Sequence, residues 1–101
     1  MSRAKILIPR EKIAAFCRTH HICRLALFGS VLRDDFRPDS DVDVLVEFEP
    51  GHPVGLIRLA GIERELSVLL GRKVDLNTAG FLSHYFRKQV LSEAEVCYVA
   101  A

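Results

Sequence analysis

Apolar and polar positions form distinct blocks along the chain, and each block predicts one element of secondary structure. Ile13, Phe16 and Cys17 recur at spacings of three and four residues, which predicts an amphipathic helix over residues 9–20 that begins at Pro9. A longer helix is predicted over residues 56–70, where the apolar stripe consists of Leu56, Leu59, Ile62 (or Glu63), Leu66, Leu69 and Leu70, and Gly71 follows its end.

Short apolar runs between these helices predict strands over residues 23–28, 41–48 and 72–77, with a possible final strand over 96–99. Two further helices are expected, a short one from Ser30 to about Asp35 and one over roughly 81–91. Strands that alternate with helices favour an α/β fold, a small mixed sheet packed against helices. The helix between the second and third strands favours a parallel pair, whereas the direction of the first two strands stays open.

Length and composition narrow the class of protein. The chain has 101 residues, half of them hydrophobic, which suits one domain over residues 1–101 with one core. The net charge is +1 and the basic residues are scattered, which argues against binding to a nucleic-acid duplex. The apolar runs are too short to span a membrane, and the N-terminus does not resemble a signal peptide, so we expect a cytoplasmic protein. An enzyme acting on a small molecule or a phosphate, and a protein-interaction module, both remain open.

Neither the cysteines nor the histidines have the spacing of a metal site. Cys17, Cys23 and Cys97 form no CxxC pair, and we expect reduced thiols that pack as small apolar groups. His20 and His21 end the first helix, where a cation suits the helix dipole. His52 and His84 have no metal-binding partner at a useful spacing, so we expect no ligand role for the histidines.

Two acidic residues, Asp41 and Asp43, interrupt the start of the most apolar strand. Residues two apart in a strand point to the same face, about 7 Å apart along the backbone. Two carboxylates so placed repel each other unless a cation lies between them, and Mg²⁺ shared with substrate phosphates is a fitting cation. Asp75, an acid inside the third apolar strand, is the best candidate for a third ligand. Glu47 and Glu49 share the same parity, but we interpret them as a solvated strand end.

Gly29 and Ser30 follow a buried strand and open the short helix on the other side of this site. Glycine allows the backbone to approach a ligand closely, and backbone N–H groups at a helix start attract an anion. The hydroxyl of Ser30 can add a hydrogen bond, and it can equally cap the helix. A phosphate cradle facing a metal site is the arrangement that phosphoryl or nucleotidyl transfer requires.

The sequence contains a GSx10DxD pattern, formed by Gly29-Ser30, ten intervening residues and Asp41-Val42-Asp43. This pattern resembles the signature of the nucleotidyltransferase superfamily with the DNA polymerase β-like fold. The stretches around Arg33, 38–41 and 45–48 look like the minimal nucleotidyltransferase (MNT) group. One departure is Asp34, where many relatives carry glycine, and it affects the shape of the spacer loop more than the chemistry.

The resemblance implies an enzyme that transfers a nucleoside monophosphate from a triphosphate to a hydroxyl and releases pyrophosphate. It implies that Asp41 and Asp43 hold two Mg²⁺ ions, and that Asp75 binds the second ion and helps to activate the acceptor. The nucleotide-binding residues that it implies are Gly29, Ser30, Arg33 and Ser40. Minimal members of the superfamily are commonly antitoxins of HEPN-domain toxins, and some of them adenylylate a tyrosine of the toxin with ATP.

Several alternatives stay open at this stage. Asp75 could be an edge-strand acid paired with Arg72 or Lys73, and Arg33 could contact phosphate or pair with Asp34 or Asp35. The protein could be an antitoxin that acts by binding alone, or a small-molecule nucleotidyltransferase such as one that modifies an aminoglycoside. The absence of a substrate domain argues against the last of these, and we expect a partner protein to complete the acceptor site. The nucleobase, the acceptor residue and the oligomeric state are not determined by the sequence.

Overall fold

The computed structural model describes residues 6–34, 36–52, 54–78, 88 and 92–100. In chain order its elements are the helix α1 (Arg10–Thr19), the strand β1 (Ile22–Phe28), the 3₁₀ turn η1 (Gly29–Leu32), the strand β2 (Val42–Phe48), the helix α2 (Leu56–Leu70) and the strands β3 (Val74–Thr78) and β4 (Glu95–Val99).

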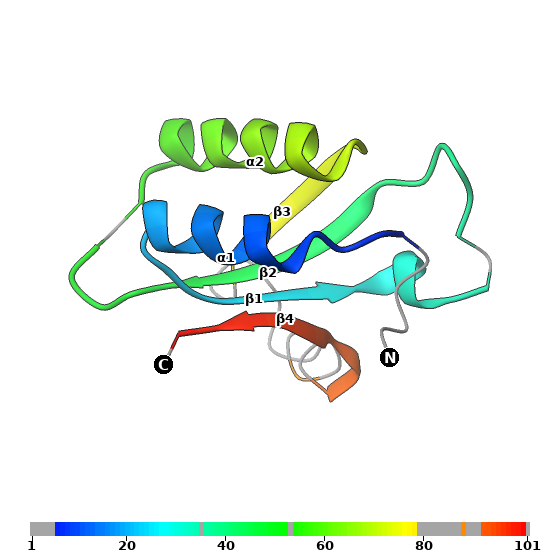
Figure 1. The fold of residues 1–101 in the computed structure, drawn as a ribbon, viewed down its shortest axis with the longest axis horizontal. Coiled ribbons are helices and arrows are strands. Elements are labelled where there is room, and N and C mark those ends of the chain that lie inside the picture. The colour runs from blue at the N-terminus through cyan, green and yellow to red at the C-terminus, as the bar shows by residue number, and fades with distance from the viewer. Residues whose placement is uncertain (1–5, 35, 53, 79–87, 89–91, 101) are drawn as a thin grey trace.

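The four strands form one mixed sheet in the order β3-β2-β1-β4. β1 runs antiparallel to both β2 and β4, and β2 runs parallel to β3 through the crossover helix α2. Both helices lie on the same face of the sheet (Figure 1). The predicted mixed sheet and its parallel pair are therefore confirmed, and the direction that the sequence left open, between β1 and β2, is antiparallel.

The core lies between the helices and one face of the sheet. Alternate residues of β2 point into it, so that Val42, Val44 and Val46 are fully buried, together with Ile62 and Leu66 of α2. Leu45 is buried with Phe28 on the other face of the sheet. Side chains alternate between the two faces of a strand, so the odd-numbered residues of β2 point to this face, opposite α1 and α2. Asp43 is one of these residues.

The helix α2 agrees with the predicted bounds, but its apolar surface is wider than its core contact. Leu56, Ile57 and Val68 are 71%, 91% and 82% exposed. The stripe predicted from the sequence included Leu56, which instead lies on the exposed side in the first turn. Neither helix in the described part of the chain combines the length and the apolar character that a membrane crossing requires.

The segment after β1 is shorter than predicted. In place of a helix over residues 30–35, a single 3₁₀ turn ends at Leu32, because the Arg33 N–H closes onto the Ser30 carbonyl and the backbone of Arg33 is then extended. The predicted strand at the C-terminal end is confirmed as β4. The helix predicted over 81–91 lies outside the described residues, apart from residue 88.

The cysteines are all free, as the sequence predicted. Cys17 is fully buried, and burial raises the pKa of its thiol to about 12. Since the thiolate is the reactive form, this cysteine behaves as a core side chain.

Candidate active site

Strand register brings the three predicted acids to one end of the sheet. Asp43 of β2 is paired with Phe28 of β1 on one side and with Asp75 of β3 on the other. Neighbouring strands lie about 4.8 Å apart, so Asp43 and Asp75 leave the backbone one strand spacing from each other. Asp41 immediately precedes β2. Asp43 and Asp75 project from the sheet face opposite the helices, because Val42, Val44 and Val74 point into the core.

The three carboxylates act on one another electrostatically. Burial raises the pKa of Asp43 above its ordinary value, the charges of Asp75 and Asp41 raise it further, and Arg33 partly offsets these effects. Ionisation of Asp43 therefore adds a third negative charge next to those of Asp75 and Asp41. An oxygen-rich cluster of this kind fits a hard divalent cation such as Mg²⁺, because a cation removes the repulsion that raises the pKa.

Gly29 is required at its position for two physical reasons. Its φ of +76° lies in the left-handed region, which side chains other than glycine rarely adopt. A Cβ built on Gly29 would also collide with the carboxylate oxygen Oδ2 of Asp43. The turn that opens η1 thus passes directly over the central acid, and the backbone can approach the carboxylate this closely only because residue 29 has no side chain.

The strand that carries Asp75 is held at the sheet edge by side chains of α2. The N–H of Leu76 donates to Oε2 of Glu63 at 2.7 Å, and the N–H of Val74 donates to Oγ of Ser67 at 3.0 Å. These two donors face away from β2 and would otherwise be unpaired at an edge. The contacts fix β3 against α2 on both sides of Asp75.

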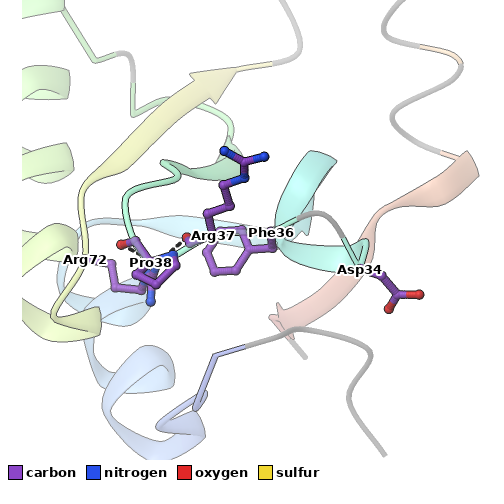
Figure 2. A pocket seen from close by; sticks show the side chains of 5 residues that line it. All are labelled: Asp34, Phe36, Arg37, Pro38 and Arg72. Atoms are coloured by element: carbon purple, nitrogen blue, oxygen red, sulfur yellow. Dashed lines mark hydrogen bonds between the residues drawn. The ribbon is translucent and has the colours of Figure 1, made fainter.

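The loop that leads into Asp41 is held by Arg72. Its guanidinium donates to the carbonyl oxygens of Arg37 and Pro38 at 2.9 and 2.8 Å and lies 4.6 Å from the centre of the Phe36 ring. Figure 2 shows this arrangement around a cavity of about 350 Å³ that is lined by Asp34, Phe36, Arg37, Pro38 and Arg72. None of the three aspartates lines that cavity. Arg72 therefore acts on the site through the backbone of the loop.

Replacing Arg72 by lysine is expected to loosen this loop. Lysine lacks the planar guanidinium that lies over the Phe36 ring and holds its donor nitrogen in a fixed direction, so we expect a loss of about 1–2 kcal/mol in the free energy of unfolding. Misplacement of the backbone before Asp41 should also lower the rate of any reaction at the three acids by about ten- to a hundredfold. Chemical denaturation and initial rates measure the two effects. Arg64→Lys, at an exposed position of α2, serves as the control, and wild-type behaviour of Arg72→Lys would show that the loop does not depend on Arg72.

The other residues predicted for the nucleotide site, Ser30, Arg33 and Ser40, differ in their contacts. Ser30 is half-buried within η1, and Arg33 follows it near enough to Asp43 to lower the pKa of Asp43. The hydroxyl of Ser40 accepts the backbone N–H of Arg37 at 3.0 Å, which closes the turn before Asp41. The structure therefore places Ser40 in a local turn contact, and the predicted role of Ser40 in nucleotide binding stays a prediction.

The alternative ion pairs for Asp75 are not the ones that form. Arg72 turns to the loop, and Nζ of Lys73 lies 3.9 Å from Oδ2 of Asp41. Both Lys73 and Asp41 are largely exposed in that pair, so it contributes little to stability. Glu47 pairs with Arg24 at 3.8 Å at the far end of β2, in agreement with its interpretation as a strand-end acid. Sequence reasoning missed Arg72 and Glu63 as supports of the site, because their partners lie far along the chain.

Comparison with known proteins identifies the relatives of this chain. The profile of the nucleotidyltransferase domain family matches residues 10–97. The protein adenylyltransferase MntA of Thermococcus cleftensis is 40% identical to this chain over 75 residues, which cover 74% of this chain and 72% of that protein.

Solved structures agree with the observed fold. A structure described as a minimal nucleotidyltransferase superposes with a TM-score of 0.71 at 41% identity and covers 85% of this chain and 86% of its own. A complex of a tri-AMPylated Shewanella oneidensis HEPN toxin with an MNT antitoxin gives a TM-score of 0.67 at 22% identity, with 90% of this chain and 70% of that chain covered. At that identity the second likeness shows the fold alone.

Proposed function

The chain belongs to the nucleotidyltransferase domain family and is a nucleotidyltransferase enzyme, and we propose that it transfers AMP from ATP to a tyrosine hydroxyl of a HEPN-domain toxin, as the antitoxin of that toxin. One observation carries this proposal: strand register pairs Asp43 with Asp75, while Asp41 lies two residues before Asp43 and the backbone of Gly29 lies against the Asp43 carboxylate. The similarity to the adenylyltransferase MntA supports a protein acceptor. We place the reaction in the cytoplasm, where ATP is supplied and free cysteines persist.

The proposed division of labour follows from the positions of the side chains. Asp41, Asp43 and Asp75 would hold two Mg²⁺ ions, which supply charge neutralisation at the triphosphate when bound. The backbone of Gly29 and the Ser30 hydroxyl bind the triphosphate, and Arg33 and Ser40 contribute to nucleotide binding.

In the transfer step, the acceptor oxygen forms a bond to the α-phosphorus while the bond from the α-phosphorus to the pyrophosphate oxygen breaks. Asp75, which is exposed on the edge strand β3, takes the proton of the acceptor hydroxyl, and pyrophosphate leaves with the electron pair of the broken bond.

A protein partner is also supported by the surface of α2. Ile57 and Val68 are highly exposed, and eleven helical residues at about 100° each place them only about 20° apart around the helix axis. Exposed apolar side chains that share one side of a helix are typical of docking surfaces. This surface would bind the toxin, whose tyrosine would have to pass the β3 edge to reach the acids on the opposite face of the sheet.

The proposal predicts label transfer from ATP to the toxin. The chain, Mg²⁺ and the HEPN protein are incubated with ATP labelled at the α-phosphate, and label is expected on the toxin. Label at the γ-phosphate should not transfer, which separates adenylylation from phosphorylation. The Asp41→Asn/Asp43→Asn variant should bind the toxin and transfer no label, and replacement of the acceptor tyrosine by phenylalanine should abolish labelling.

A second candidate is an antitoxin that acts by contact alone, which the exposed side chains of α2 favour. The same variants distinguish it. Full neutralisation of the toxin by Asp41→Asn/Asp43→Asn would favour contact, whereas loss of neutralisation with retained binding would favour transfer. Transfer of the label to a small hydroxyl compound, with no label on the toxin, would contradict both candidate functions.

A further inference from the structure

Two histidines and a glutamate meet at the end of the sheet opposite the three aspartates. Nδ1 of His21 lies 3.2 Å from Oε2 of Glu49, and the rings of His21 and His52 are stacked with their centres 3.9 Å apart and an interplanar angle of 7°. One ligand atom from each of the three side chains lies within 4.8 Å of the others. Within the described ranges, no other three His, Cys, Asp or Glu side chains form so compact a group.

The backbone around this group is held by a turn and a cross-strand hydrogen bond. Residues 49–52 form a turn in which the N–H of His52 donates to the Glu49 carbonyl at 3.2 Å, with Pro50 second and Gly51 third at a φ of +85°. These are the residues and the conformation of a type II turn. The N–H of Glu49 donates in turn to the His21 carbonyl at 2.8 Å.

His52 thus has two potential metal-binding partners, which its spacing in the sequence did not reveal. His21 and Glu49 are 28 residues apart, so no local spacing pattern reveals them. They meet because Ile22 at the start of β1 pairs with Phe48 at the end of β2.

We propose that His21, Glu49 and His52 form a binding site for a divalent transition-metal ion of the zinc type, separate from the three aspartates. Two imidazole nitrogens and one carboxylate oxygen are a donor set that Zn²⁺ takes in proteins, whereas Mg²⁺ prefers oxygen alone. Ligands about 2.0–2.2 Å from a tetrahedral zinc ion lie about 3.3–3.5 Å from each other. The His21–Glu49 separation of 3.2 Å is close to this value, so the ion would replace the proton that joins the two groups.

Metal binding requires the stacked rings to separate. A ring nitrogen binds a metal in the plane of its ring, so two parallel rings cannot both bind one ion. His52 is exposed in the turn and can rotate about its side-chain bonds, while His21 stays against Glu49. His21 and His52 line a cavity of about 250 Å³ together with His20 and Arg58, and this space would leave a fourth position for water. The bound ion would join the α1–β1 junction to the turn before α2.

The test is a calorimetric titration of the metal-depleted full chain with Zn²⁺, with excess Mg²⁺ present to occupy the aspartates. We expect one zinc ion per chain and a higher melting temperature. His52→Ala and Glu49→Gln should each lower the affinity by at least about a hundredfold, since even the loss of a group that supports a ligand costs about 10–100-fold.

Matched controls separate this site from its neighbours. Glu47→Gln removes an acid of the same strand end with a similarly exposed side chain, 39% against 43% for Glu49, and should leave zinc affinity unchanged. His20→Ala removes the adjacent histidine, whose Nε2 instead contacts Glu65 at 2.9 Å, and should also retain binding. In NMR spectra of the imidazole nitrogens, zinc should shift the signals of His21 and His52 together.

The assignment is overturned by any of three results. These are the absence of saturable zinc binding, an unchanged affinity in His52→Ala with intact circular dichroism, and a loss of affinity in Asp41→Asn/Asp43→Asn or in Cys23→Ser/Cys97→Ser equal to that in His52→Ala. None of them bears on AMP transfer, so the metal site and the proposed enzyme function succeed or fail separately.

Discussion

Replacing Asp43 by asparagine is expected to abolish nucleotide transfer while making the protein slightly more stable. The central acid of the cluster is lost, so the rate should fall by at least about a thousandfold, or about 4 kcal/mol of transition-state stabilisation. The pKa of Asp43 is raised in the folded protein by burial, by Asp75 and by Asp41. Its ionised form is therefore less favourable in the folded state than in the unfolded chain, and a neutral asparagine removes that penalty.

The pH dependence follows from the direction of this shift. The penalty is fully present above the folded pKa of Asp43 and disappears as the pH falls below its ordinary value of 3.8. Asp43→Asn should thus exceed the wild type in stability at pH 7, by less than about 1 kcal/mol because the carboxylate is partly hydrated, and should lose this advantage in acid.

Urea unfolding across pH, with and without Mg²⁺, measures the difference in stability, and the labelling assay measures the loss of transfer. Mg²⁺ should stabilise the wild type more than the variant. Asp39→Asn, an exposed acid in the same stretch, should match the wild type in stability and activity. Loss of stability in Asp43→Asn at pH 7 would show that the carboxylate supports the fold, and would contradict a destabilising repulsion among the three acids.

Replacing Gly29 by alanine is expected to damage both the fold and the activity. The left-handed conformation costs an alanine about 1–2 kcal/mol. The new Cβ would also collide with Oδ2 of Asp43, so the carboxylate must move. Misplacement of a reacting group by about 1 Å can cost a hundredfold in rate, and we expect a loss of at least this size in transfer.

Gly71→Ala is the matched control for this substitution. Gly71 has a similar φ of +69° at the end of α2, and a Cβ built there has no neighbouring atom within 4 Å. The two variants should share the conformational loss of stability, measured by thermal unfolding, but only Gly29→Ala should lose activity. Equal activity in both would mean that Asp43 can move without consequence for the reaction.

The sequence predicted those parts of the site that depend on local patterns. Alternation in β2 places Val42 and Val44 in the core between sheet and helices and therefore Asp43 on the opposite face, and an acid in an apolar strand identified Asp75. Glycine before a helical turn identified Gly29. Each of these inferences needs only the two-residue repeat of a strand or the conformational freedom of glycine.

The parts that the sequence could not predict depend on contacts between distant segments. Arg72 reaches a loop some 35 residues away, and its direction follows from how β3 is seated beside β2. The pairing of His21 with Glu49 depends on the antiparallel register of β1 and β2, whose direction the sequence left open. A charged side chain has many possible partners of opposite charge along the sequence, and only the strand register determines which of them lies next to it.

The hydrogen bonds from β3 to Glu63 and Ser67 also limit how another protein can approach Asp75. A partner that extends the sheet by adding a strand needs the outward N–H groups of the edge strand, and those of Val74 and Leu76 are already used by α2. Strand addition along this edge is therefore blocked. A polypeptide that offers its hydroxyl to Asp75 therefore cannot rely on backbone pairing along β3, so its recognition depends more on side-chain shape and charge.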